Sequence, residues 1–474
     1  MSDHVCELAI AKRAHRPGIL LRLGWVVAHC LMLPVMIWAS DRVPDKDVAD
    51  SLQAVFENAP DTIDHKVFAE GNLDSYLREA ALRNPGLRAA FYDWMAALAK
   101  THYAGSLPDP TVAYAYFASP VETRLGPQNQ KISLKQKFPW FGVLDAAKDE
   151  AVAAANAAYQ KYEAKRLLLF YRIKSAYAKF YLLGQKIDLT REDFELLNSW
   201  ESVVRTKYKV SLSRHADMIK AQVELGILEE RLLSLEHQTL SAGAVLMGAL
   251  DSHGGESLPI PVSLGGHEGS IPLDGAIASA LLINPDLKAM GFITQQHEAG
   301  VRNARRSARP NFTFGVDYIE IGESIFAPFD QAGKDALSVN VAFNLPIWFG
   351  KNGARTKAAR ARHRAAEYRR AEYSNRLRTK VEETHFGFED ALRKLRLYRD
   401  GLVPKAEQSL GAAYTAYQSG SLDFLTLLDA QKSLLGVRLK REQALTDLFM
   451  RRAHLEMLTG REWTDADVSP ASGE

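Results

Sequence analysis

The sequence predicts a mainly α-helical protein with a small antiparallel β part, built from a unit that occurs twice along the chain. Three observations lead to this prediction. Long Ala-rich segments carry apolar residues at helical spacing, and four short segments alternate apolar and polar residues as strands do. Several short motifs also recur in the same order in the two halves of the chain, which indicates a tandem duplication.

Three pairs of motifs define the duplication, and their order and spacing are nearly the same in both copies. The pairs are "LRNPGLRAA" (82–90) with "LINPDLKAM" (282–290), "FPWFG" (138–142) with "LPIWFG" (345–350), and "KYKVSLSRHADMIKAQ" (207–222) with "AYQSGSLDFLTLLDAQ" (416–431). Each copy reads as helix, strand, strand, helix, helix.

The duplication divides the chain into six parts. A Gly/Pro/Ser-rich linker joins the two repeats. The predicted parts are a signal peptide at 1–40, an N-terminal extension at 41–70, the first repeat at 71–250, the linker at 251–271, the second repeat at 272–460 and a C-terminal tail at 461–474. The predicted hairpins are 111–138 and 311–345, and the predicted long helices occupy 143–249 and 351–459.

Both corner motifs, "FPWFG" and "LPIWFG", follow a strand and precede a helix. Pro139 and Pro346 cannot donate a hydrogen bond to a sheet, so each would end its strand. We expect Gly142 and Gly350 to supply the unusual backbone angles of the turn into the helix.

The hairpin segments alternate strongly. Leu337, Val339 and Val341 share one predicted face, whereas Ser338 and Asn340 share the other. One face of the sheet would therefore meet apolar material and the other would meet water.

The long helices carry apolar stripes at the spacing of a coiled coil. No proline interrupts residues 142–208, and about 65 helical residues would span roughly 100 Å. The two stripes are Tyr159, Tyr162, Leu169, Ile173, Ala176, Phe180 and Leu183 in the first copy, and Tyr373, Leu377, Val381, Phe388, Leu395 and Leu402 in the second. A globular domain cannot bury such rods, so they would pack side by side in an elongated assembly.

The first forty residues have basic groups followed by an apolar run, which is typical of a secretory signal peptide. A membrane anchor is the alternative, but the apolar run is short for a span of about 20 residues. Cys6 and Cys30 both lie here, so the mature chain would carry no thiol. His29 and the continuing apolar run argue against lipidation of Cys30.

Composition and motifs give no indication of an enzyme or of a cofactor site. Without residues 1–40 the formal charge is about zero, which is unlike a nucleic-acid-binding protein. No catalytic or phosphate-binding motif is present, and the scattered histidines predict no metal site. Residues 351–380 contain many Lys and Arg, which we interpret as a solvated face or a contact with anionic lipid.

Taken together, these features resemble the TolC-type outer-membrane efflux family. The motifs that carry the resemblance are the two "NP" motifs, "LPDPTVAYAYF", both corner motifs and the "YxxGxxxxxxxxDAQ" pattern at 417–431. The resemblance implies a passive export channel in the Gram-negative outer membrane that extends into the periplasm. It also implies a homotrimer whose transmembrane twelve-stranded barrel continues into a long α-helical barrel, in contact with outer-membrane lipid, a periplasmic adaptor protein and an inner-membrane pump.

Physical reasoning agrees with a trimer. Four strands cannot close a barrel, and an open sheet edge is not tolerated in lipid. Two chains would give eight strands, a barrel filled by its own side chains, whereas three would give twelve strands and room for water.

By the same resemblance, the turns at 210–214 and 419–422 lie at the periplasmic tips, where such channels close. Asp217 and Asp429 match tip positions that are often acidic, and Arg214, Tyr417 and Asp423 lie beside them. These five residues are the candidate gate. The alternative is that the tip charges cap helices or are simply solvated.

Two further readings stay open. The chain could be a channel for protein secretion, or a periplasmic coiled-coil scaffold that never enters a membrane. The "LPDP" segment and the corners look most similar to the heavy-metal efflux branch of the family.

Overall fold

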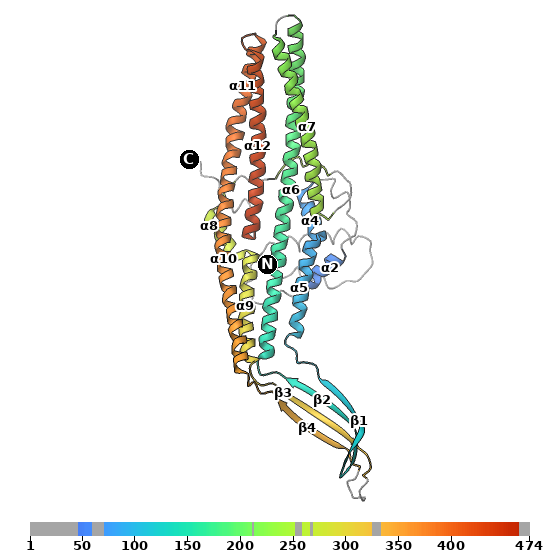
Figure 1. The fold of residues 1–474 in the computed structure, drawn as a ribbon. Helices are drawn as coiled ribbons and strands as arrows, with labels where there is room; N and C mark the ends of the chain where they lie inside the picture. Colours follow the sequence, from blue (N-terminus) through green and yellow to red (C-terminus); the bar gives the residue numbers. More distant parts are fainter. Residues whose placement is uncertain are drawn as a thin grey trace, which may run out of the picture.

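The computed structural model describes residues 46–58, 71–210, 213–251, 258–265, 269–324 and 333–463. Within this part, long helices lie side by side in an elongated bundle, a four-stranded sheet occupies one end, and two helical hairpin tips lie at the other (Figure 1). The predicted signal peptide, both cysteines and nearly all of the predicted C-terminal tail lie outside the described residues.

A mainly helical chain with one small antiparallel sheet is confirmed. The elements of the first repeat are α4 (Leu73–Arg83), α5 (Pro85–Tyr103), β1 (Thr111–Thr123), β2 (Gly126–Phe138), α6 (Val143–Lys209) and α7 (His215–Ala249). Those of the second are α8 (Leu273–Ile283), α9 (Pro285–Arg306), β3 (Phe312–Ile321), β4 (Ala336–Phe343), α10 (Phe349–Arg396), η2 (Leu397–Leu402), α11 (Val403–Gln418) and α12 (Phe424–Thr459).

The N-terminal extension contains a helix that the sequence analysis did not anticipate, α2 (Lys46–Glu57). Ala49 and Phe56 of α2 are buried, and the Phe56 ring lies 4.9 Å from that of Phe91 in α5. Because these apolar side chains complete the core around α4 and α5, part of the extension folds with the first repeat.

Each repeat opens with two helices, so the predicted single opening helix is wrong. The break falls at the "NP" motif in both copies, since the residue before a proline is disfavoured in the α conformation. Asn84 and Asn284 are both extended there, with ψ of 117° and 122°, and each caps the next helix by accepting a hydrogen bond of 3.0 Å from the backbone N–H of Leu87 or Leu287.

The same two asparagines also hold the far end of their own repeat. The Asn84 amide donates to the carbonyl of Ala249 at the end of α7, and the Asn284 amide donates to the carbonyl of Leu458 at the end of α12. The distances are 3.2 and 2.9 Å. The duplicated motif therefore joins the first and last helices of each unit.

The first long helix of the second repeat is not continuous, which corrects the predicted uniform rod. The six residues of η2 form a π-helical segment between α10 and α11, and Pro404 follows it. Proline has no N–H to continue the α-helical ladder, and π-helical segments are common where that ladder is interrupted.

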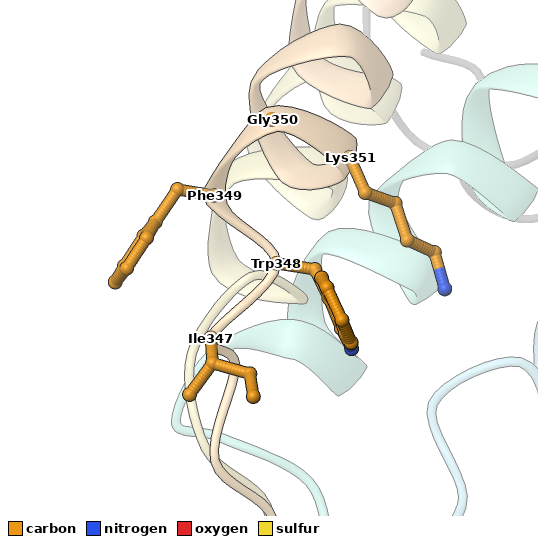
Figure 2. A pocket seen from close by; sticks show the side chains of 5 residues that line it. All are labelled: Ile347, Trp348, Phe349, Gly350 and Lys351. Carbon is orange, nitrogen blue, oxygen red and sulfur yellow. The ribbon is translucent and has the colours of Figure 1, made fainter.

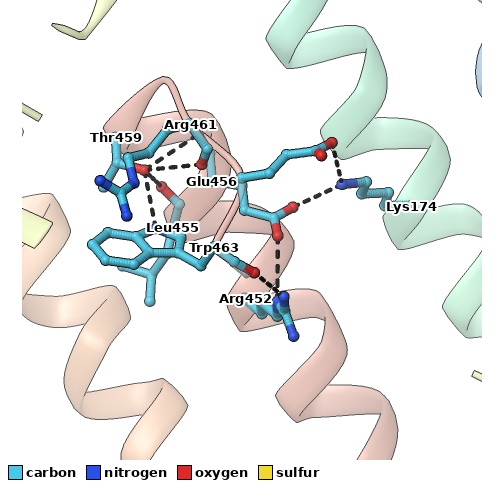
Figure 3. A network of polar contacts seen from close by, with 8 residues as sticks. Lys174, Arg452, Leu455, Glu456, Thr459, Arg461 and Trp463 are labelled. Atoms are coloured by element: carbon cyan, nitrogen blue, oxygen red, sulfur yellow. Dashed lines mark hydrogen bonds and ion pairs between the residues drawn. The ribbon is translucent and has the colours of Figure 1, made fainter. Parts of the chain in front are cut away.

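The repeats pack on each other through α6, which lies against α9 and α12. Lys174 of α6 forms an ion pair of 2.7 Å with Glu456 of α12, and Arg452 lies 3.3 Å from the same carboxylate (Figure 3). Arg452 also donates to the carbonyl of Trp463, whose indole donates to Thr459. This network fastens the end of α12 to the first repeat.

Among the described residues, one helical stretch, Leu273–Arg306, is long and apolar enough to cross a membrane. It is divided into α8 and α9 at Asn284, and 44% of its apolar window is buried against the rest of the protein. We interpret it as part of the helical core.

Candidate functional site

The four strands form one antiparallel sheet in the order β1-β2-β3-β4, and its first face is apolar. Val112, Leu134, Val316 and Val339 stand in one row across the strands. A second row contains Tyr114, Ile132, Tyr318 and Leu337. All eight side chains are exposed, so no described part of a single chain covers this face.

The opposite face is polar and internally bonded. Asp317 lies 3.0 Å from the Lys131 ammonium group and accepts a 3.0 Å hydrogen bond from the Asn340 amide. Ser133 and Ser338 are the cross-strand neighbours of Asp317. The sheet therefore divides an apolar environment from a polar one, as the alternation in the sequence predicted.

Both edges of the sheet, β1 and β4, lack a partner strand in the described chain. The pairing of β2 with β3 joins the two hairpins, and so the two repeats contribute to a single surface. A sheet with one apolar face and two open edges requires further strands before it is stable in lipid.

The first corner follows the expected logic. Pro139 comes directly after the end of β2, and Gly142 precedes α6 with φ of 75°, the left-handed region that glycine tolerates. Arg306 donates a 2.7 Å hydrogen bond to the carbonyl of Gly142. A side chain at residue 142 would collide with the Arg306 guanidinium.

The second corner departs from the prediction. Gly350 lies inside the first turn of α10, has no positive φ, and has open space where a Cβ would stand. Pro346 comes after β4 has already ended at Phe343. Ile347, Trp348 and Phe349 are instead strongly exposed around an open hollow that Lys351 also lines (Figure 2). The role expected for Gly350 is therefore wrong.

At the tip between α6 and α7, Asp217 acts as a helix cap. Its carboxylate accepts hydrogen bonds from the backbone N–H of Arg214 at 3.3 Å and from the Ser213 hydroxyl at 3.2 Å. Such bonds satisfy donors that a helix start leaves open. Residues 211 and 212 of this turn lie outside the described part of the chain.

At the tip between α11 and α12, Asp423 caps the start of α12. It accepts from the backbone N–H of Thr426 at 2.9 Å and from the Thr426 hydroxyl at 2.6 Å. These bonds, aided by the charge of Arg214 on the other tip, lower the pKa of the Asp423 carboxyl. Gly420, with φ of 79°, makes the turn.

Tyr417 connects the two tips. The Lys207 ammonium group of α6 lies 4.1 Å from the centre of its ring, and the Phe424 ring packs at 5.9 Å. The Tyr417 hydroxyl is buried without a hydrogen-bond partner in the described chain. Burial, followed by the charge of Asp217, raises the pKa of Tyr417. Asp429, in contrast, is exposed and forms no ion pair with the described residues.

Residues 76–251 and 276–461 match the family model described as outer membrane efflux protein, one match for each repeat. The chain belongs to the outer membrane efflux protein family. Membership of this efflux family places the protein in the Gram-negative outer membrane, with its helices extending into the periplasm. Several solved structures to which it is similar are outer-membrane channels, those of OprN, CmeC and MtrE among them.

Two curated members of the efflux family are similar along most of the chain. The pyoverdine export outer membrane protein OpmQ of Pseudomonas putida is 24% identical, covering 79% of this chain and 83% of OpmQ. The outer membrane protein OprJ of Pseudomonas aeruginosa is also 24% identical, covering 90% of this chain and 94% of OprJ.

The fold of this efflux protein matches known structures. The outer membrane protein VceC of Vibrio cholerae superposes with a TM-score of 0.69 at 19% sequence identity, covering 83% of this chain and 97% of VceC. At this level of identity the similarity shows a shared architecture.

Sequence reasoning missed two polar contacts of α6 in this efflux protein, one with α12 of the second repeat and one with α7 of the first. Gln431 of α12 donates to Asp193 of α6, and at the matching position of the first repeat Gln222 of α7 donates to Glu201 of α6 at 3.1 Å. Burial raises the pKa of Asp193. The only indication of these contacts in the sequence is the dipeptide "AQ", which ends both tip motifs and contains the two glutamines.

Within the described part of the chain, no group of three or more His, Cys, Asp or Glu side chains is placed to hold a metal ion.

Proposed function

We propose that the protein is the outer-membrane channel of a tripartite efflux system. Three copies form a twelve-stranded barrel continued by an α-helical barrel, and the channel passively exports small solutes or metal ions that an inner-membrane pump and a periplasmic adaptor protein deliver. The observation that carries the proposal is the four-stranded sheet, which has an uncovered apolar face, a bonded polar face and two open edges.

The helices also support closure into a ring, because they too leave open sides with exposed apolar residues. Within the chain, α7 packs on α6 and α11 packs on α12, which leaves α7 and α11 as the two open sides of the tip end. Ile219, Val223 and Ile227 form an exposed apolar row on α7, one turn apart. Contact between α7 of one copy and α11 of the next would bury this row.

The tips are the proposed gate. Arg214, Asp217, Tyr417, Asp423 and Asp429 all lie in the last turns next to the two hairpin ends. Asp217 and Asp423 stabilise the tip helices, Tyr417 holds the two tips together, and Asp429 and Arg214 are exposed for bonds to a neighbouring copy. A permanently open channel would breach the membrane, so a partner must break these bonds.

The relative OpmQ is named for the export of pyoverdine, a small solute, which favours a small cargo over a secreted protein. Assignment to the heavy-metal branch stays a prediction. Identification of the pump and adaptor that co-purify with the protein would decide the cargo class, and a partner dedicated to protein secretion would overturn the small-solute proposal.

Cysteine cross-linking tests the assembly, since the only two native cysteines lie in residues 1–40. Val223→Cys on α7 and Gly411→Cys on α11 are suitable, because Val223 is exposed and a side chain at residue 411 meets open space. With a short bismaleimide, the double variant should give a ladder that ends at trimer, and each single variant should give none. A ladder that ends at dimer, or that continues past trimer, would reject the twelve-stranded barrel.

A further inference from the structure

The boundary between sheet and helices carries a concentration of unpaired positive charge. We call the basic collar the five exposed residues Arg305, Arg309, Lys351, Arg355 and Lys357. The first two lie at the end of α9 and just beyond it, and the other three lie in the first turns of α10. Among the described residues, none of the five has a carboxylate within 4.0 Å.

The position of the basic collar relative to the sheet is fixed by the helix geometry. At about 1.5 Å per residue, Lys351, Arg355 and Lys357 fall within about 12 Å of the start of α10. The sheet begins on the other side of this corner (Figure 1). If the sheet spans the hydrocarbon layer, Lys351 lies at the height of the lipid headgroups, a zone about 5 to 8 Å deep on each side. The long side chains of Arg355 and Lys357 can reach this zone, because side chains in a helix lean toward its N-terminus.

Exposed apolar side chains lie directly beside these charges. Trp348 is 71% exposed and Phe349 80%, and Trp348 and Lys351 project on the same side of the corner (Figure 2). Phe141 of the first corner is 81% exposed. Aromatic side chains of this kind are stable at a membrane interface, where the ring meets the glycerol and acyl region while neighbouring cations reach the headgroups.

We propose that the basic collar binds the phosphate groups of anionic phospholipids in the leaflet next to the helices, with Trp348 packed at glycerol level. Charge complementarity favours this occupant, because the first turn of α10 contains no acidic residue. An electrostatic attraction of this kind is worth about a fivefold gain in affinity for each cation near the surface. The inference rests on the outer-membrane location and does not depend on the cargo.

The test compares two triple variants of the same helix. Lys351→Gln, Arg355→Gln and Lys357→Gln together remove the α10 part of the collar. Arg364→Gln, Arg369→Gln and Arg370→Gln remove equal charge roughly 20 Å further from the start of α10. All six side chains are exposed and lack ion pairs within the described chain.

Native mass spectrometry of the purified full-length protein, titrated with phosphatidylglycerol or phosphatidylcholine, gives the readout. The parent and the control variant should bind phosphatidylglycerol at least tenfold more tightly than phosphatidylcholine, and the collar variant should lose this preference. No preference in the parent, or an equal loss in both variants, would overturn the proposal.

Ion selectivity in planar bilayers separates the lipid site from a site for anionic cargo. If the collar variant keeps its lipid preference but becomes less permeable to anions, these cations line the water-filled path and the lipid site is rejected. An absence of conductance in every variant would count against the proposed channel function while leaving the lipid result intact.

Discussion

The Lys207 ammonium group lies 4.1 Å from the centre of the Tyr417 ring, and this contact joins the α6–α7 tip of the first repeat to the α11–α12 tip of the second. The two residues come from different hairpins, and the buried Phe424 ring supports Tyr417 from α12, the second helix of the hairpin that contains Tyr417. Separation of the tips within one chain must break this cation–π contact, which makes Tyr417 the residue through which the tips are coupled.

Replacement of Tyr417 by leucine should loosen the closed tips. A cation–π pair at a partly exposed site is worth about 0.5 to 1 kcal/mol, so its loss should raise the open population of each protomer roughly two- to fivefold. Single-channel recording should show higher conductance with an unchanged amount of trimer. Tyr417→Phe keeps the ring and should behave like the parent, because the hydroxyl has no hydrogen-bond partner among the described residues. Equal effects of both variants would contradict the coupling.

Replacement of Asp217 and replacement of Asp429 should have different effects on the stability of the tip, although both residues are candidate gate residues. Asp217→Ala removes a cap at the start of α7 and should cost about 1 kcal/mol of local stability. Hydrogen exchange in the first turn of α7 should then be roughly fivefold faster, with Asp429→Ala indistinguishable from the parent in that turn. An effect of Asp429→Ala on conductance would reveal a partner on a neighbouring copy, whereas no effect on either readout would remove Asp429 from the gate.

The two faces of β4 should tolerate charge very differently. Val339→Arg places a charge on the apolar face and should cost about 2 to 4 kcal/mol if it lies near the bilayer midplane. Ser338→Arg puts the same charge opposite Asp317 on the polar face and should be mild. Yield of heat-stable trimer in outer-membrane fractions measures the difference, and equal tolerance at both positions would be incompatible with a membrane-spanning sheet.

The "NP" asparagines should contribute unequally to stability. Asn284 is buried, so Asn284→Ala leaves the carbonyl of Leu458 and a helix start without partners and should cost about 2 to 3 kcal/mol. Asn84→Ala affects a partly solvated site and should cost about 1 kcal/mol. The temperature at which the trimer dissociates in detergent gives the comparison; a larger loss at Asn84 would contradict this assignment.

Acid should weaken the contact of α12 with α6 and α10. Burial, reinforced by the nearby charges of Lys380 and Arg451, lowers the pKa of His454 to about 4, while its ring stacks on Tyr171. The neutral form is therefore favoured in the folded protein. Its stabilisation is fully present above the ordinary histidine pKa of about 6.5 and is lost as the pH falls through that value toward 4.

The size of this effect is on the order of 2 kcal/mol after an allowance for solvent screening. His454→Phe keeps the aromatic contact and cannot titrate, so its dissociation temperature should fall less than that of the parent between pH 7 and pH 4.5. If both proteins lose stability in parallel, another group governs the acid response.

Several features were predictable because they depend on local chemistry. Alternation in β4 placed Val339 and Asn340 on opposite faces, and the proline-free stripe through Tyr162 and Ile173 predicted the long α6. The split at Asn84 also has a local cause, because proline disfavours the α conformation of the residue before it, but the apolar spacing that continues across the "NP" motif conceals it. Gly350 was misassigned because similarity to Gly142 suggested a similar backbone angle.

The sequence by itself determined the duplication, the helical and strand segments, the polarity of the sheet and the family, since these follow from periodicity and motif order. Only the tertiary structure decided that Gln431 meets Asp193, that Lys207 meets Tyr417, and that Asp429 stays exposed. The physical reason is the separation of these residues along the sequence. Periodicity specifies which face of an element is apolar, but side chains more than 200 residues apart meet only after the packing of α6 on α12 has fixed the rotation and register of both helices.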